Sequence, residues 1–208
     1  MRPVIRKETI MEQFSFDPTD SQELAIEKLI DFLNSRDHQP LFLLKGYAGT
    51  GKTTLVSALI RALRGLNIGC TQLAPTGRAA KVMMHASGFP AFTIHKWIYS
   101  RRRTRDGFFR TELKPNFLSN SLFIVDEASM ISGNLTDLEQ GHLLDDLIEF
   151  VYQKPGNALV LIGDGFQLPP VGTNESPALS PRYLKDRYPV TLFQSELTDV
   201  VRRAVESG

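Results

Sequence analysis

Residues 46–53 have the sequence Gly-Tyr-Ala-Gly-Thr-Gly-Lys-Thr, which is rich in glycine and ends in a lysine and a threonine. It matches the spacing G-x-x-x-x-G-K-T. An apolar run at residues 41–44 precedes it, and a helical pattern begins near Lys52. A strand, a glycine-rich loop and a helix in this order place backbone N–H groups around a phosphate. The stretch therefore predicts a phosphate-binding loop at the end of a strand.

The residue types in this loop suit a nucleoside triphosphate. Gly49 and Gly51 let the backbone turn tightly, so that successive N–H groups point at phosphate oxygens. Lys52 can reach the β- and γ-phosphates, and the hydroxyl of Thr53 is a ligand for Mg²⁺. The sequence therefore predicts ATP and Mg²⁺ as cofactors. The predicted nucleotide-binding residues of the loop are Gly46, Ala48, Gly49, Thr50, Gly51, Lys52, Thr53 and Thr54.

Short apolar runs alternate with helical patterns along the rest of the chain. Asp20 or Ser21 can cap a helix, whose predicted apolar face consists of Leu24, Ile26, Leu29, Ile30 and Leu33. Further helices are predicted at residues 77–86 and 138–152, and further strands at 68–74, 121–125, 158–162 and 190–193. This alternation indicates an α/β fold with a mostly parallel sheet and helices on both faces.

Charge is unevenly distributed, although the formal net charge of the 208 residues is only +1. Residues 96–114 contain seven basic and two acidic residues, whereas residues 115–150 contain seven acidic residues and no Lys or Arg. This uneven distribution of charge predicts a basic face for a polyanion and a carboxylate-rich region elsewhere.

A chain of this length and composition is expected to form one domain.

The single cysteine, Cys70, lies in an apolar stretch and excludes an internal disulfide. We interpret it as a buried free thiol. The N-terminal residues have no apolar segment of signal-peptide length, and no segment approaches the length of a membrane span. These features predict a cytoplasmic protein without a membrane partner.

Two carboxylates follow the strand predicted at residues 121–125. Asp126 offers an oxygen ligand for Mg²⁺ at the strand end, and Glu127 projects elsewhere, where it can act as general base on the attacking water. Alone, such a pair is often a helix N-cap. Downstream of a phosphate-binding loop, we interpret it as metal ligand and catalytic base.

A third polar group follows the strand predicted at residues 158–162. There Asp164 and Gln167 stand in a turn that two prolines stiffen. The amide of Gln167 both donates and accepts hydrogen bonds, which suits contact with a γ-phosphate or the attacking water.

These motifs, taken in order, resemble superfamily 1 DNA helicases of the RecD-like or Dda-like branch, in their first RecA-like motor domain. The resemblance covers the chain from about Thr19 to Arg203. Its most specific segment is residues 163–171, Gly-Asp-Gly-Phe-Gln-Leu-Pro-Pro-Val. The other matching segments are residues 19–22, 46–53, 74–80, 93–95, 126–129 and 196–202.

The resemblance implies further roles at the nucleotide. Gln22 matches a glutamine that contacts adenine, since a side-chain amide can pair with N6 and N7 of that base. Without the resemblance, helix capping is the simpler interpretation of Gln22. Arg202 matches an arginine that approaches the γ-phosphate. Arg203 departs from the glutamine common in the family and receives no role. The predicted catalytic residues are Lys52, Glu127, Gln167 and Arg202.

The resemblance also implies contacts with single-stranded DNA. One matching segment contains Thr76, Gly77 and Arg78, whose hydroxyl, guanidinium and N–H groups suit a phosphate backbone. A second contains Thr93 and His95. A single histidine is otherwise more often a structural residue.

A basic insertion is predicted at about residues 97–114. Asp106-Gly107 between polar and aromatic residues is a hairpin signal. Relatives have a pin here that splits duplexes, while basic residues with aromatic neighbours also suit a single-strand path. A solvated surface is the third interpretation. The candidate DNA-binding side chains are Arg101, Arg102, Arg103 and Arg105.

The domain organisation follows from the same resemblance. Residues 1–18 are predicted to be an N-terminal arm and 19–208 the first motor domain, with the second RecA-like lobe missing from the chain. Residues 1–208 alone are therefore expected not to unwind DNA, because translocation needs two lobes that close and open. The predicted function is ATP hydrolysis coupled to 5′-to-3′ movement on single-stranded DNA. The alternatives are an ATP-regulated DNA-binding module with little turnover, and an enzyme acting on a small molecule.

Overall fold

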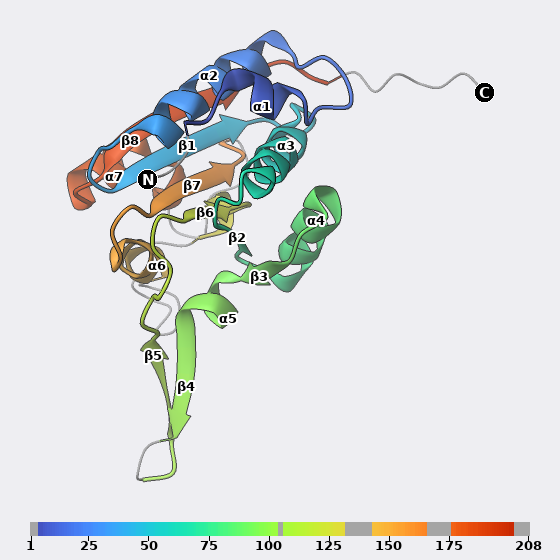
Figure 1. Ribbon diagram of the computed structural model, residues 1–208. Helices are drawn as coiled ribbons and strands as arrows, with labels where there is room; N and C mark the ends of the chain where they lie inside the picture. Colours follow the sequence, from blue (N-terminus) through green and yellow to red (C-terminus); the bar gives the residue numbers. More distant parts are fainter. Residues whose placement is uncertain (1–3, 104–105, 132–142, 166–175, 202–208) are drawn as a thin grey trace.

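A parallel sheet forms the centre of the computed structural model, which describes residues 4–103, 106–131, 143–165 and 176–201 (Figure 1). Its strands are β1 (Pro40–Gly46), β2 (Cys70–Ala74), β3 (Ala91–Thr93), β6 (Leu122–Val125), β7 (Ala158–Gly163) and β8 (Thr191–Leu197). Within the described residues they form one six-stranded sheet, in the order β3-β2-β6-β7-β1-β8, and all neighbours are parallel. The predicted α/β class is confirmed.

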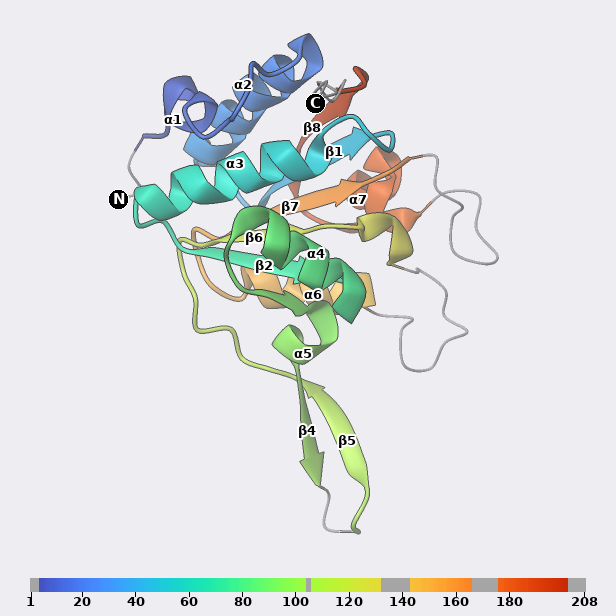
Figure 2. The same ribbon diagram turned by 90° about the vertical axis from the view of Figure 1, so that its right-hand side faces the viewer.

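Helices cover both faces of this sheet (Figures 1 and 2). Alternate strand residues point to opposite sides, so Phe42 and Leu44 of β1 join one core cluster while Leu41 and Leu43 join the other. The first cluster includes residues of α1 (Lys7–Met11), α2 (Asp20–Asn34), α3 (Lys52–Gly65) and α4 (Gly77–Ser87). The second includes residues of α5 (Ile94–Ile98), α6 (Leu143–Tyr152) and α7 (Pro181–Arg187).

The predicted apolar face of α2 is partly wrong. Leu24 is 49% exposed, while Phe32, which the prediction omitted, is buried against Phe42 and Phe193. The helix is rotated so that Gln22 and Ala25 face the protein. Tertiary contacts at the helix N-terminus decide this rotation, and apolar periodicity alone does not report them.

Part of the predicted N-terminal arm packs against the domain. Ile5 and Ile10 are buried in the core cluster of α2 and α3. The backbone of Ile5 donates to Asn34 Oδ1 at 3.0 Å and accepts from Asn34 Nδ2 at 2.9 Å. Ile5 and Ile10 therefore belong to the core of the domain, while the polar residues between them are exposed or half-buried.

The predicted basic hairpin is confirmed as a separate two-stranded antiparallel sheet, β4 (Tyr99–Arg103) and β5 (Phe109–Leu113). Gly107 has φ +87°, a left-handed conformation that favours glycine. At the base of the hairpin, Tyr99 donates from its hydroxyl to Asp146 of α6, and Lys114 Nζ donates to the carbonyl oxygens of Lys96 and Trp97. These contacts hold the base of the hairpin against α5 and α6.

Cys70 is buried, as predicted, and burial raises the pKa of its thiol to about 12. At pH 8 only ~10⁻⁴ of it is the reactive thiolate. We therefore expect a disulfide reagent to label the unfolded chain at least ~10²-fold faster than the folded chain, as followed by absorbance of the released thiolate. Stoichiometric labelling of the folded protein within minutes would contradict this burial.

In the described part of the chain, no helix is both long and apolar enough to cross a membrane.

Candidate nucleotide and nucleic-acid site

The loops that carry the predicted site residues begin at the carboxyl ends of the parallel strands. Parallel strands end at a common edge, and polar loops follow them there. Lys45 of β1 lies beside Gly163 of β7 and Glu196 of β8, and Val125 of β6 lies beside Leu161 of β7. The loops after β1, β6, β7 and β8 therefore begin close together, with only β7 between the phosphate-binding loop and Asp126.

The phosphate-binding loop has the backbone that its glycines predict. Gly49 and Gly51 have φ +83° and +82°, a region costly for other residues. Thr50 Oγ1 and Lys52 Nζ each donate to the carbonyl oxygen of Tyr47 at 2.8 Å. Lys52 also donates to the carbonyl oxygen of Gly46. The ammonium group of Lys52 is thus folded over the loop, where a phosphate chain would lie.

The sheet brings Asp126 and the phosphate-binding loop to one edge, although 74 positions separate Asp126 from Lys52 in the sequence. Burial raises the pKa of Asp126 above its ordinary value, while the N–H of Glu127 and the ammonium of Lys52 act in the opposite direction. The hydrogen bond from Glu127 N to Asp126 Oδ1 measures 2.9 Å. A half-buried carboxylate beside an ammonium group favours a further cation, because the cation would stabilise its charged form.

Glu127 occupies an unusual backbone conformation. Its φ of 54° and ψ of 36° lie in the left-handed region, where side chains other than glycine are uncommon. The turn that it starts, η1 (Ala128–Met130), packs against β7. There a Cβ on Gly163 would lie 3.2 Å from the backbone nitrogen of Ser129 and 2.7 Å from Leu179. Such strain persists where the surrounding structure determines it, and it is found most often at functional sites.

The oxygen ligands predicted for Mg²⁺ fit that ion. Thr53 is exposed in the first turn of α3, and Asp126 stands half-buried at the end of β6. A hydroxyl and a carboxylate are hard oxygen donors, and Mg²⁺ typically takes only one or two protein ligands and keeps several waters. Among the described residues no group of three or more His, Cys, Asp or Glu side chains forms a metal site of its own.

Gln22 behaves as the simpler interpretation predicts. Its side chain is 0% exposed, and its Oε1 accepts from Thr19 N at 3.0 Å in a capping box. Its Nε2 donates to the carbonyl oxygens of Thr50 and Gly51 at 3.5 and 3.4 Å. The amide is therefore bound to backbone on both sides, and it joins α2 to the phosphate-binding loop. Contact with adenine stays a prediction, and it requires this amide to exchange partners.

The segment after β8 crosses the phosphate-binding loop, a contact that the sequence did not reveal. Val201 N donates to the carbonyl oxygen of Gly49 at 3.0 Å. Asp199 Oδ2 accepts from Ser21 N at 2.9 Å, which also lowers the pKa of Asp199. These partners lie 152 and 178 positions apart, so no local signal could have found them.

Two predicted catalytic residues and one predicted DNA-binding residue lie outside the described part of the chain: Gln167, Arg202 and Arg105. Their roles stay predictions. Asp164, before Gln167, is 8% exposed at the end of β7.

The predicted DNA-binding threonines are helix caps in the structure. Thr76 Oγ1 accepts from Ala79 N at 3.2 Å, and Thr93 Oγ1 accepts from Lys96 N at 3.3 Å. Thr76 follows β2, and Thr93 is the last residue of the neighbouring strand β3, where it is paired with Ala74. The two helix starts therefore lie side by side. A threonine that caps a helix can still present backbone N–H groups to a phosphate.

The other predicted DNA-binding side chains differ in accessibility. Gly77 and Arg78 are exposed in the first turn of α4, whereas His95 is half-buried against the ring of Tyr99. The exposed side chains on β4 are Arg101, Arg102 and Arg103. Arg102 forms an ion pair with Glu112 at 3.6 Å.

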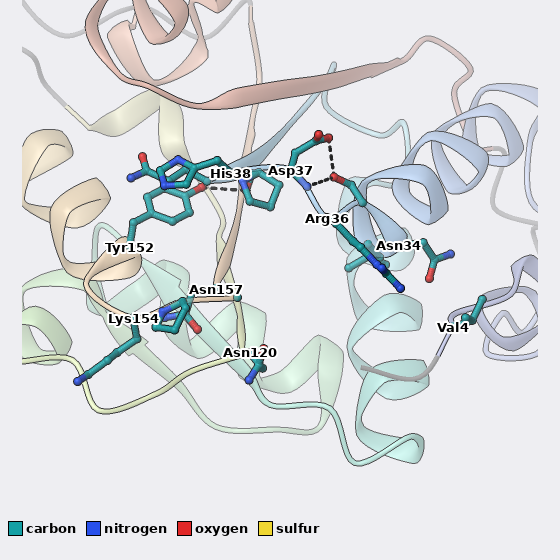
Figure 3. A pocket seen from close by; sticks show the side chains of 15 residues that line it. Val4, Asn34, Arg36, Asp37, His38, Asn120, Tyr152, Lys154 and Asn157 are labelled. Atoms are coloured by element: carbon teal, nitrogen blue, oxygen red, sulfur yellow. Dashed lines mark hydrogen bonds between the residues drawn. The ribbon is translucent and has the colours of Figure 1, made fainter. Parts of the chain in front are cut away.

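A cavity of about 630 Å³ lies at the opposite edge of the sheet (Figure 3). Pro40, at the start of β1, and Asn120 and Asn157, just before β6 and β7, line it. The cavity therefore adjoins the amino-terminal ends of the strands, and it is separate from the phosphate-binding loop.

Comparison with known proteins agrees with this geometry. A family model described as an AAA domain matches residues 19–205. The ATP-dependent DNA helicase dda of Enterobacteria phage T4 is 31% identical over 190 residues, which cover 89% of this chain and 40% of that protein. The ATP-dependent RecD2 DNA helicase of Deinococcus radiodurans is 34% identical over 155 residues, or 74% of this chain and 19% of that protein.

A solved structure supports the fold. The crystal structure of Pif1 helicase from Candida albicans aligns with a TM-score of 0.53 at 21% identity, covering 88% of this chain and 40% of that one. The chain thus spans between about a fifth and two fifths of the length of these relatives. It belongs to the AAA-domain family, in the RecD- and Pif1-like branch of the superfamily 1 helicases.

Proposed function

We propose that this chain is an ATP-binding and ATP-hydrolysing motor domain that acts on single-stranded DNA, with 5′-to-3′ movement in the complete protein. The observation that carries the proposal is the strand order β6-β7-β1, because it places the phosphate-binding loop after β1 and the Asp126-Glu127 pair after β6 at one edge of the sheet, with only β7 between them. The related ATP-dependent DNA helicases support the DNA substrate. The buried free thiol of Cys70 suits a reducing, cytoplasmic compartment.

Each residue of the site has its own role in the proposed hydrolysis of ATP. The loop backbone and Lys52 bind the phosphate chain, and Thr53 and Asp126 would hold Mg²⁺. When bound, the ion neutralises charge that develops on the phosphate oxygens. Glu127 lies one residue beyond Asp126 and accepts the proton of the attacking water. In this proposal Gln167 and Arg202 contact the γ-phosphate.

The direct test is ATP hydrolysis by the complete protein with and without a single-stranded oligonucleotide, because residues 1–208 alone are expected to hydrolyse ATP weakly or not at all. We expect Mg²⁺-dependent turnover that rises when the oligonucleotide is added. Nucleotide binding without turnover would favour the ATP-regulated binding module instead. Binding of no oligonucleotide at all would favour an enzyme that acts on a small molecule.

The hairpin has the composition of a single-strand contact. Arg103 is paired with Phe109, which is 73% exposed, and Phe108 beside it is 75% exposed. Arg102 lies directly across from Arg110, where two like charges repel each other. A phosphate between them would remove this repulsion, and exposed aromatic rings can stack on bases.

Replacing Arg101, Arg102, Arg103 and Arg105 with serine should therefore weaken binding similarly for all sequences. The slope of log affinity against log salt should flatten by up to about three units, because each single-strand phosphate contact contributes ~0.7. Fluorescence anisotropy over a salt series measures this slope. A matched control replaces four cations elsewhere: Lys28, Arg36, Arg182 and Lys185. Unchanged affinity with impaired unwinding in the complete protein would indicate a wedge, and no change in either would indicate a solvated surface.

A further inference from the structure

Helix α4 presents a basic face that none of the proposed roles uses beyond its first turn. Its sequence, Gly-Arg-Ala-Ala-Lys-Val-Met-Met-His-Ala-Ser, contains no acidic residue. Arg78, Lys81 and His85 are exposed, whereas Ala80 and Met83 are buried against the domain. Spacings of three and four residues place the three basic side chains on one face.

These basic groups have no partner in the described part of the chain. Neither Arg78, Lys81 nor His85 makes a hydrogen bond or ion pair among the residues that the structure describes. Basic side chains elsewhere differ: Arg64 donates to the carbonyl oxygen of Cys70 at 2.7 Å, and Arg187 binds Asp145 through two hydrogen bonds. The α4 face is therefore a concentration of positive charge that the neighbouring protein does not neutralise.

The position of α4 connects this face to the proposed DNA contacts. The helix begins at the carboxyl end of β2, directly after Thr76, and packs on the edge strand β3 that leads to α5 and the hairpin. Figure 2 shows α4, α5 and the hairpin in succession along this side of the molecule. From Arg78 to His85 the helix rises by about 10 Å, since each residue adds ~1.5 Å. Phosphates of a nucleic-acid strand repeat at comparable or shorter distances, so such a face can contact two or three of them.

We propose that the face of α4 formed by Arg78, Lys81 and His85 binds the phosphate backbone of nucleic acid that extends beyond the strand-end loops. The proposal rests on the proposed function and adds a contact surface to it. Val82, which is 55% exposed on the same face, gives an apolar contact between the charges. The backbone is that of a longer single strand, which continues from the predicted single-strand contacts at the strand-end loops; binding to the duplex arm of a fork is the alternative outcome of the test.

The test uses Lys81→Gln with His85→Gln, because glutamine keeps the helix propensity and removes the charge of Lys81 and the imidazole of His85. The control is Lys28→Gln with Lys185→Gln, which changes exposed lysines on α2 and α7. Binding is measured by anisotropy over a salt series with three labelled probes: an eight-nucleotide strand, a thirty-nucleotide strand and a forked duplex. Arg78 is kept, since it belongs to the loop contact.

We expect the α4 variant to bind the eight-nucleotide strand normally and the longer probes ~3- to 10-fold more weakly. Its salt slope should fall by ~0.7 for each lost single-strand phosphate, or ~0.9 on duplex. Loss on both longer probes assigns the surface to single strand, and loss on the fork alone assigns it to duplex. Lys81→Arg with His85→Arg should bind at least as tightly as the original protein.

Equal affinities of the α4 variant and its control for every probe would refute the α4 surface alone. If the unaltered protein binds no probe, the proposed function itself fails together with this surface. Nucleotide affinity and the circular dichroism spectrum should be unchanged in the variant. A variant that loses helical structure is replaced by Val82→Glu alone, whose added carboxylate should weaken only the longer probes.

Discussion

Glu127→Gln is expected to lower steady-state ATP hydrolysis by roughly 10²–10⁴-fold while leaving ATP binding intact. Glutamine preserves the size and the hydrogen-bonding groups of the side chain and removes only its basicity. The unusual φ of 54° affects both side chains alike, because Glu and Gln have similar backbone preferences; the comparison therefore isolates the proton acceptor. Turnover is measured in protein that carries both motor lobes, with saturating single-stranded DNA and Mg²⁺.

A matched control for this prediction is Glu149→Gln, which changes an exposed carboxylate on α6. It should hydrolyse ATP at the original rate. Binding of a fluorescent nucleotide shows whether either variant has lost its site. Comparable turnover in Glu127→Gln and the original protein would mean that another group activates the water.

Lys52→Ala should weaken binding of Mg-ATP by at least an order of magnitude. The substitution removes the positive charge at the terminal phosphates, and the phosphate-binding backbone of Gly49 and Gly51 cannot replace it. Calorimetric titration measures the affinity directly, with Lys28→Ala as a control for an exposed lysine on α2. Equal affinity in the Lys52 variant and the original protein would contradict the assignment of residues 46–53 as the phosphate-binding loop.

Lys52 also donates to the carbonyl oxygens of Gly46 and Tyr47, so its loss can disturb the loop itself. Lys52→Gln separates the two effects, because its amide can still donate to a carbonyl oxygen but carries no charge. We expect nucleotide affinity to fall in both variants and the melting temperature to change little in Lys52→Gln. Restored affinity in the glutamine variant would show that loop geometry, rather than charge, governs binding.

Several parts of the structure follow from local sequence alone. The left-handed backbone at Gly49, Gly51 and Gly107 is predictable because glycine adopts it without steric cost. The apolar runs of β1, β6 and β7 are buried on both faces, and a run of this kind carries its own signal. Short-range patterns therefore identify the phosphate-binding loop, the carboxylates after β6 and the basic hairpin.

Other parts depend on residues far apart in the sequence. The outermost strand, β3, has only three residues, all half-buried, and α5 has only five residues. Neither element is long enough to show a periodic pattern in the sequence. The buried Ile5 and Ile10 lie in a segment whose average polarity predicts an arm. Only packing against α2 and α3 shows that these two side chains belong to the core.

In the nucleotide site, too, some features follow from the local sequence and others depend on the tertiary structure. By itself the sequence determined which residues supply phosphate-binding N–H groups, charge and oxygen ligands, because those properties belong to single residues and short spacings. The tertiary structure alone decided that Gln22 is enclosed by the carbonyl oxygens of Thr50 and Gly51, and that Asp199 binds the N-terminus of α2. These contacts arise when strands distant in sequence align in one sheet, and no local pattern encodes that alignment.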